Sequence, residues 1–226
     1  MLKFFYNPLS PNVRRVWLTL LEKGISFETV LVKLNGDQLQ PEFLEINPFH
    51  HVPVVVDDGL RLIESLAILD YLETRYPIPT LLPTAPEALA KVRIVQMVTA
   101  NELFPLVMRL IYESEDSPQI AQAKHEIDKV LRFFTELLGN GSYFGSEQLT
   151  LGDIVAGAAV PLLPKLGINL SNDYPKIYEW CERLMQRPAW RKTELSVEDF
   201  KQFKRRVQVL VKLRRRELSR VNNAKS

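Results

Sequence analysis

The sequence predicts an α/β domain at the N-terminus and an all-helical domain after it. Three observations lead to this fold class. In residues 1–76, short apolar runs alternate with segments of helical periodicity. Residues 77–88, PIPTLLPTAPEA, are rich in proline and are expected to form a stiff, extended linker. In residues 89–195, apolar residues recur at helical spacing and no segment has a convincing strand pattern.

The elements of the first domain are expected in the order βαβαββα. We expect strands at residues 2–6, 26–31, 53–56 and 60–63, and helices at residues 11–23, 41–46 and 65–76. Asn7-Pro8 should end the first strand. Ser10-Pro11 then predicts a helix start, since serine is a favoured N-cap and proline suits the first helical position. Asp-Asp-Gly at residues 57–59 predicts a turn between two antiparallel strands.

The second domain is expected to contain helices at residues 89–115, 120–138, 150–163 and 174–186. Pro105 falls inside the first of them and should kink it, because proline removes one hydrogen bond and clashes with the preceding turn. The third begins with Thr150 and Asp153, a close variant of the capping box. Residues 154–163 are apolar nearly all round, so this helix should be central and buried.

The composition is that of an ordinary globular protein. The 226 residues are 46% apolar and 25% charged, and the formal net charge of +2 does not suggest a nucleic-acid partner. A single cysteine, Cys181, excludes an intrachain disulfide and fits a reducing compartment. No window approaches about 18 uninterrupted apolar residues, and the N-terminal apolar run is too short for a signal peptide. We therefore expect a cytoplasmic protein without a transmembrane segment.

Positive charge is concentrated in a C-terminal segment, residues 196–226. This segment carries ten Lys and Arg against three Asp and Glu, a net charge of +7 that leaves −5 on the rest of the chain. An amphipathic helix is expected over residues 197–220, with a basic face around Arg214–Arg216. Its apolar stripe consists of Phe200, Phe203, Val207, Leu210 and Leu213.

Three roles for this basic segment remain open. It packs across the helical domain with a solvated charged face, or it covers a substrate pocket and attracts anionic substrates. In the third alternative it contacts acidic lipid or nucleic acid.

Four motifs occur in an order that is typical of one family. They are a helix start with Ser10 and Arg14, NPFHHVPVV at residues 47–55, ESLAIL at residues 64–69 and LTLGDI at residues 149–154. Together they make residues 1–195 resemble the cytosolic glutathione transferases, with a serine-type (theta, delta or phi-like) pattern. The resemblance implies a thioredoxin-like N-terminal domain that binds glutathione, followed by an all-helical domain.

The resemblance also implies where glutathione binds. Val52-Pro53 is a candidate cis peptide, since the trans preference before proline is only about 0.5–1 kcal/mol. Val52 would then offer its backbone N–H and C=O to the ligand, as one more strand would. Glu64 and Ser65 stand at a helix start, where free N–H groups and the macrodipole favour a carboxylate. The family implies the γ-glutamyl carboxylate there, with Glu64 facing the amino group; the alternative is that the pair only caps the helix.

Ser10 is the candidate catalytic residue. Only the thiolate of glutathione is a good nucleophile, and lowering a thiol pKa of about 8.5 by two units requires about 2.7 kcal/mol of preferential stabilisation. A hydroxyl donor at a helix N-terminus supplies part of this, and Ser10 resembles the serine of the serine-type classes. Tyr6 is the alternative, because other classes use a tyrosine at the end of this strand. If these roles fail, Ser10 only caps its helix and Tyr6 only packs in the core.

Gln38, His50 and His51 complete the candidate glutathione site. The resemblance places His50 near the glycine or cysteinyl part of glutathione and His51 near the glycine carboxylate; the alternative is that both are solvated loop residues. Two departures weaken the match to delta-like relatives. Those relatives carry a basic residue at the position of Leu66, and often a histidine at that of Gln38, which can still hydrogen-bond the glycine carboxylate. No third ligand is suitably spaced for a metal site.

Phe104, Met108 and Tyr112 recur every four residues and are expected to line an apolar pocket for a second substrate, between the domains. The alternative is that they are ordinary helical core. The resemblance implies a homodimeric enzyme that conjugates glutathione to small electrophiles. Two other functions remain open: another glutathione-dependent activity on the same site, as in a peroxidase, dehalogenase or isomerase, and a non-catalytic interaction module built on this fold.

Overall fold

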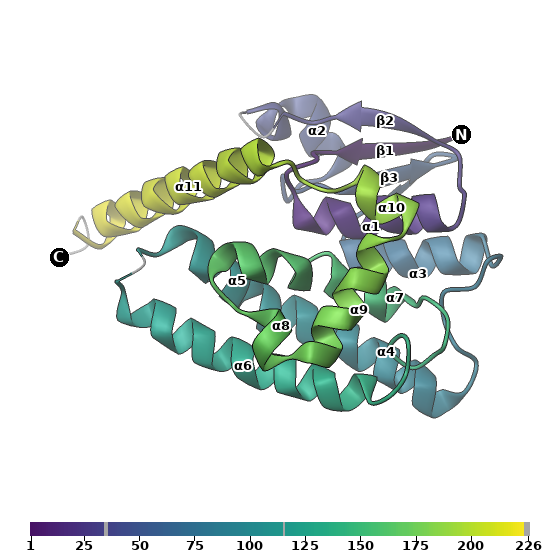
Figure 1. Cartoon of the computed structure of the whole chain (residues 1–226). Helices are drawn as coiled ribbons and strands as arrows, with labels where there is room; N and C mark the ends of the chain where they lie inside the picture. Colours follow the sequence, from purple (N-terminus) through teal and green to yellow (C-terminus); the bar gives the residue numbers. More distant parts are fainter. Residues whose placement is uncertain (34–35, 115, 224–226) are drawn as a thin grey trace.

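The N-terminal domain is built around a four-stranded mixed sheet with the order β2-β1-β3-β4 (Figure 1). The computed structural model describes residues 1–33, 36–114 and 116–223. The strands are β1 (Leu2–Tyr6), β2 (Phe27–Leu31), β3 (Val54–Asp57) and β4 (Leu60–Leu62). β1 runs parallel to β2 and antiparallel to β3, and β3 runs antiparallel to β4. This mixed sheet confirms the predicted thioredoxin-like domain.

Helices cover both faces of the sheet. They are α1 (Pro11–Glu22), α2 (Pro41–Ile46), preceded by the 3-10 turn η1 (Asp37–Leu39), and α3 (Ser65–Arg75). α1 and α3 pack against each other on the face that is turned toward the helical domain, and α2 lies on the other face (Figure 1). Alternation along β1 explains this layering: Phe4 is fully buried, whereas the next residue, Phe5, contacts Phe43 of α2.

The second domain is helical, as predicted. Its elements are α4 (Pro86–Val98), the π-helical turn η2 (Thr99–Leu103), α5 (Phe104–Tyr112), α6 (Pro118–Leu138), α7 (Leu151–Gly157), the 3-10 segment η3 (Val160–Leu166), α8 (Leu170–Asp173), α9 (Pro175–Met185) and α10 (Pro188–Lys192). The interruption predicted at Pro105 takes the form of η2, where the N–H of Phe104 bonds to the C=O of Thr99. Glu115, predicted as the last residue of the first helix, lies outside the described residues.

The helix predicted over residues 150–163 is wrong at its C-terminal end, since α7 stops at Gly157 and a 3-10 segment follows. In an α-helix the C=O of Gly157 would accept the N–H of residue 161, which is proline and has none. The indole Nε1 of Trp190 donates to that carbonyl instead, at 3.3 Å. Trp190 and Leu184 pack so closely that a Cβ at position 157 would lie 2.6 Å from Leu184 Cδ1.

The start of α7 is as predicted. The Thr150 side chain accepts from the N–H of Asp153, and the Asp153 carboxylate accepts from the N–H of Thr150, which together form a capping box. Every residue of α7 is buried. The helix is therefore the central element of the second domain, and it packs on α4 and α1.

The helical stretch Pro86–Tyr112 is long and apolar enough to cross a membrane by length and composition alone. The sequence analysis expects no transmembrane segment, and a single helix that meets these criteria is weak evidence for one. In the fold this stretch is a core helix, because its residues Val92, Val95, Leu103 and Val107 are buried among the other helices.

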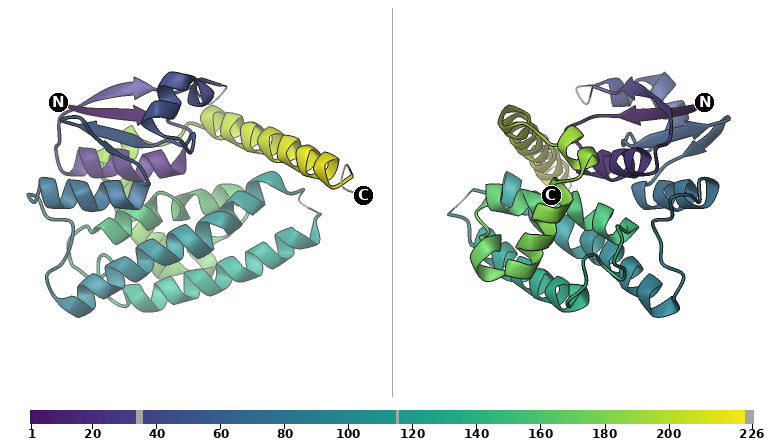
Figure 2. Two further views of the ribbon diagram at one scale, coloured as in Figure 1. Left: turned by 180° about the vertical axis from the view of Figure 1, so that it is seen from behind. Right: turned by 45° about the vertical axis from the view of Figure 1, so that its right-hand side comes forward.

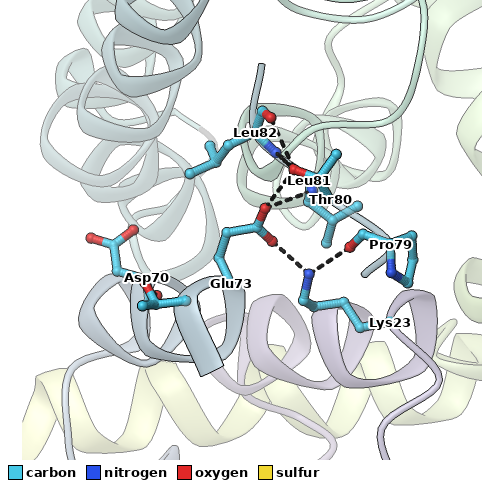
Figure 3. A network of polar contacts seen from close by, with 8 residues as sticks. Lys23, Asp70, Glu73, Pro79, Thr80, Leu81 and Leu82 are labelled. Atoms are coloured by element: carbon cyan, nitrogen blue, oxygen red, sulfur yellow. Dashed lines mark hydrogen bonds and ion pairs between the residues drawn. The ribbon is translucent and has the colours of Figure 1, made fainter. Parts of the chain in front are cut away.

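The segment between the domains is held at both ends. Residues 77–85 contain no helix or strand, and α4 begins at Pro86, inside the predicted linker. The Lys23 ammonium, whose side chain is fully buried, donates to Glu73 Oε2 and to the Pro79 carbonyl, both at 2.6 Å (Figure 3). Glu73 Oε1 accepts from the N–H of Leu81 at 2.9 Å. The Leu81 carbonyl in turn accepts from the N–H of Leu151 at the start of α7, at 2.9 Å.

The basic C-terminal segment forms one long helix, α11 (Val197–Asn223), as the sequence predicts. Its first turns lie against the body of the protein, and its C-terminal half extends beyond both domains (Figure 2). Ser196 and Asp199 cap its start with reciprocal hydrogen bonds. The side chains after Lys212, including Leu213 and Arg214–Arg216 of the predicted basic face, lie outside the described part of the structure.

Candidate active site

A cavity of about 500 Å³ lies where the N-terminal domain meets α5 and α11. It is lined by all of the residues predicted for catalysis and glutathione binding, namely Ser10, Gln38, His50, His51, Val52, Pro53, Glu64 and Ser65. Loops and helix ends that are distant in sequence are thus brought to one place by the sheet and its helices.

Two of the three residues predicted for the second substrate, Phe104 and Met108, line this cavity. Tyr112 does not: it is half-buried at the end of α5, against the core. The physical reason is helical drift, because residues four apart are displaced by about 40° around the helix, so Tyr112 is turned by about 80° from Phe104.

Ser10 caps α1 and borders the cavity. Its extended backbone (φ −91°, ψ 118°) places the side-chain oxygen over the helix start, where Oγ accepts from the N–H of Val13 at 3.5 Å. The preceding loop is fixed by buried Asn7, which donates to the carbonyl of Val32 and accepts from the N–H of Leu9. Because its cap bond uses the hydroxyl oxygen as an acceptor, the Ser10 proton is free to be donated to a ligand.

Tyr6, the alternative to Ser10, is not among the residues that line the cavity. Its ring is half-buried, stacks on Phe4 and meets Trp17 edge to face. This aromatic packing corresponds to the core role that the sequence left open for Tyr6.

The peptide bond between Val52 and Pro53 is cis, as expected. Val52 stands immediately before β3, with its side chain buried and its backbone at the cavity. Among the described residues neither its N–H nor its C=O has a hydrogen-bond partner. An extended ligand can therefore pair with both groups as an added strand would.

The loop that carries His50 and His51 is shaped by Asn47, a residue that the sequence analysis did not single out. Asn47 is buried; its Nδ2 donates to the carbonyl of His51 at 2.8 Å and its Oδ1 accepts from the N–H of Phe49 at 3.0 Å. His50 has a positive φ of 59°. Both histidine side chains are exposed at the cavity, where they can reach a ligand.

The start of α3 also borders the cavity. Glu64 has φ 65° and ψ 114°, a strained backbone for a residue other than glycine, and no side chain caps the helix. Ser65 is buried, with its hydroxyl at the cavity. An uncapped helix start with a hydroxyl donor is suited to bind a carboxylate.

Arg15, on α1, is a second residue that the sequence analysis did not identify. It is 3% exposed; its Nη1 donates to Ser65 Oγ at 3.5 Å and its guanidinium carbon lies 5.4 Å from the centre of the Phe104 ring. Burial lowers the pKa of the Arg15 guanidinium to about 10, so the group remains cationic at pH 7. Within the described residues it forms no ion pair, and its Nε and Nη2 atoms have no hydrogen-bond partner. A buried positive charge therefore lies beside Ser65, although the next residue, Leu66, is not basic as it is in delta-like relatives.

α11 supplies one wall of the cavity, through Phe203, Arg206, Val207 and Leu210. The helix is held against α5, since Gln208 Nε2 donates to the carbonyl of Ile111 at 3.2 Å. The apolar spacing of the tail predicted this face, but not which surface it would cover. Of the three open roles, the described residues show packing on the helical domain and coverage of the pocket together. Among these residues no group of side chains is arranged to hold a metal ion.

Comparison with known proteins agrees with this geometry. The sequence profile described as "Glutathione S-transferase, N-terminal domain" matches residues 4–83, and the profile for the C-terminal domain of the same family matches residues 94–188. The chain belongs to the glutathione S-transferase family. As a glutathione S-transferase, the protein uses glutathione as its co-substrate.

Relatives of the transferase are found among plant proteins and solved insect structures. Glutathione S-transferase 3 of Zea mays is 32% identical over 87% of this chain and 94% of its own length. A glutathione S-transferase of Hyoscyamus muticus is 30% identical over 81% of this chain and 93% of its own length. The structure of an epsilon-class glutathione S-transferase from the housefly, Musca domestica, is 27% identical, with a TM-score of 0.79 over 92% of this chain and 98% of that one.

Replacing Arg15 of the transferase with methionine is expected to raise the KM for glutathione about threefold to fivefold. The buried charge would no longer favour a carboxylate at Ser65, and a shift of this size corresponds to about 1 kcal/mol. The free energy of unfolding should not fall, because an apolar side chain of similar volume removes an unpaired buried charge. Steady-state kinetics and urea denaturation measure the two effects.

Arg14→Met is the matched control for this prediction. Arg14 is equally buried on the same helix, but its Nε donates to Thr193 Oγ1 at 3.3 Å, away from Ser65. The KM of the Arg14→Met variant for glutathione should stay within about twofold of the wild-type value. An unchanged KM in Arg15→Met would show that the charge plays no part in binding.

Proposed function

We propose that this transferase binds glutathione along the Val52 backbone and conjugates its thiolate, stabilised by Ser10, to small apolar electrophiles. The observation that carries the proposal is that the hydroxyl of Ser10, the unpaired backbone of Val52 and the uncapped start of α3 border one cavity. Each of these groups is suited to a different part of the tripeptide.

In this proposal glutathione lies extended across the cavity. Its γ-glutamyl carboxylate binds at the α3 start, at Ser65, and its amino group faces Glu64. The cysteinyl backbone pairs with Val52, beside Pro53. The glycine carboxylate is bound by Gln38, His50 and His51, which border the cavity from η1 and from the loop before β3.

Ser10 then acts on the sulfur. Its hydroxyl donates a hydrogen bond to the thiolate at the positive end of the α1 dipole, which favours the charged form of the thiol. The thiolate attacks the electrophilic carbon, a carbon–sulfur bond forms, and the leaving group departs with the bonding electrons. The thiol proton is released to solvent before attack.

The second substrate binds against Phe104, Met108 and the apolar residues of α11. Behind this wall the buried Arg15 guanidinium lies 5.4 Å from the centre of the Phe104 ring. Peroxide reduction, dehalogenation and isomerisation would use the same thiolate, so a panel of substrates is needed to rank these activities against conjugation.

We further propose that the protein is a cytoplasmic homodimer that serves detoxification, as is typical of the family. The apolar side chains of Ile94 and Met97 on α4 are 40% and 46% exposed, and Leu60 on the edge strand β4 is 51% exposed. Exposed apolar groups of this kind on α4 and the N-terminal domain suit an interface between two copies.

Titration calorimetry tests the glutathione site directly. Wild-type protein should bind glutathione, and Ser65→Ala should weaken that affinity about fivefold, as expected for the loss of one hydrogen bond. Ser26→Ala, at an exposed serine before β2, is the control and should bind as the wild type does. Absence of binding by the wild-type protein, or full affinity in Ser65→Ala, would refute this assignment of the site.

A further inference from the structure

The wall of the cavity contributed by α11 contains one charged group in an apolar setting. Arg206 is half-buried, and the residues of α11 that line the cavity with it are Phe203, Val207 and Leu210. The helix is fixed here by the capping of Ser196 and by the bond from Gln208 to α5. The position of Arg206 at the cavity is therefore a property of the fold and not of a free tail.

Unlike Arg132 and Arg187, Arg206 has no acidic partner among the described residues. Arg187 pairs with Glu22 at 2.6 Å, and Arg132 pairs with Asp128 at 2.9 Å. The guanidinium at the cavity thus keeps its donors available for a ligand. A half-buried, unpaired guanidinium presents a planar fork that matches a carboxylate.

We propose that Arg206 selects electrophiles that combine an apolar body with a carboxylate. This inference rests on the proposed conjugation and adds the class of second substrate. The glycine carboxylate of glutathione already has a proposed binding site at Gln38 and the two histidines, on the N-terminal domain. The apolar side chains of α11 around Arg206 suit the body of the second substrate, with Phe104 and Met108 on α5.

The test compares two electrophiles that differ only in charge, 4-chloro-3,5-dinitrobenzoate and the corresponding neutral benzamide. In both the thiolate carbon–sulfur bond replaces the carbon–chlorine bond and chloride leaves. Arg206→Gln is expected to lower kcat/KM for the benzoate at least about fivefold and to change kcat/KM for the benzamide by less than about twofold. Arg206→Lys should restore part of the activity toward the benzoate.

Arg205→Gln is the matched control, because it removes the same charge one residue away, on the exposed face of α11. It should leave both substrates unchanged, which separates direct binding from the general field of the basic helix. Equal losses for benzoate and benzamide in Arg206→Gln would overturn the proposal. If those losses disappear with the glycine ethyl ester of glutathione, Arg206 binds glutathione instead.

The outcome also separates this inference from the proposed function. If wild-type protein conjugates the neutral benzamide and Arg206→Gln leaves the ratio between the two substrates unchanged, the proposed conjugation stands and the substrate class is wrong. If wild-type protein conjugates neither compound, the proposed function fails and the inference fails with it.

Discussion

Replacing Ser10 with alanine is expected to lower kcat/KM for conjugation of glutathione with a neutral aryl halide tenfold to a hundredfold. The substitution removes the only hydroxyl that the proposed pose places at the sulfur, and a tenfold loss corresponds to about 1.4 kcal/mol of transition-state stabilisation. The loss should appear mainly in kcat/KM at neutral pH, because the thiol of bound glutathione would be less ionised. Steady-state kinetics over a range of pH should show the apparent pKa of the bound thiol rising toward about 8.5.

Tyr6→Phe is the control for this experiment. Tyr6 does not line the cavity and its ring packs on Phe4 and Trp17, so loss of its hydroxyl should leave kcat/KM within about twofold. Ser10→Thr should retain part of the activity, since it keeps a hydroxyl at the N-cap. An active Ser10→Ala together with an inactive Tyr6→Phe would reverse the catalytic assignment.

Asp153→Ala should produce a large loss of stability. The Asp153 carboxylate is fully buried and accepts hydrogen bonds from Trp180 Nε1 at 2.8 Å, from the N–H of Phe144 at 3.0 Å and from both the N–H and the hydroxyl of Thr150. Burial raises the pKa of Asp153 to about 6, against the lowering effect of these donors, so the group is ionised at pH 7. Its donors come from the loop before α7, from the start of α7 and from α9.

Removing this carboxylate would leave three donors without an acceptor inside the helical domain, the N–H groups of Phe144 and Thr150 and the indole N–H of Trp180. The Thr150 hydroxyl can still donate to the carbonyl of Phe144 at 3.2 Å. We expect Asp153→Ala to lower the free energy of unfolding by about 3 kcal/mol or more, because each unsatisfied buried donor is costly. Urea denaturation at pH 7 measures the change. Glu126→Ala, which removes an exposed carboxylate on α6, is the control and should leave the midpoint unchanged. If the urea midpoint of Asp153→Ala equals that of the wild type, the hydrogen bonds at the start of α7 are not required for stability.

The parts of the fold that the sequence predicts well are those fixed by local chemistry. Ser10-Pro11 marks the start of α1 to the residue, and Thr150 with Asp153 marks the start of α7. Caps and prolines act within a few residues, so their effect is visible without tertiary contacts. The end of α7 at Gly157 combines both kinds of signal. Pro161, four residues on, is a local one, whereas the donor that satisfies the Gly157 carbonyl is Trp190, 33 residues away along the chain.

The candidate site shows the same division. The residues proposed to bind glutathione, such as Val52 and Ser65, belong to short motifs that the sequence displays, and they line the cavity. Arg15 and Arg206 belong to no such motif. Their significance depends on what lies opposite them, namely Ser65 for Arg15 and the cavity for Arg206. Tyr112 is an error of the opposite kind. Its spacing from Phe104 and Met108 predicted a place at the cavity, but it does not line the cavity.

The buried contact between Lys23 and Glu73 restricts how the protein can move. Leu81 is tied to Glu73 through its N–H and to Leu151 through its C=O, and one continuous core runs through both domains. Hinge bending at residues 77–85 would have to break these hydrogen bonds, which lie beside the buried Lys23. Ligands must therefore enter and leave a preformed cavity without the two domains moving apart, and α11 forms one wall of that cavity.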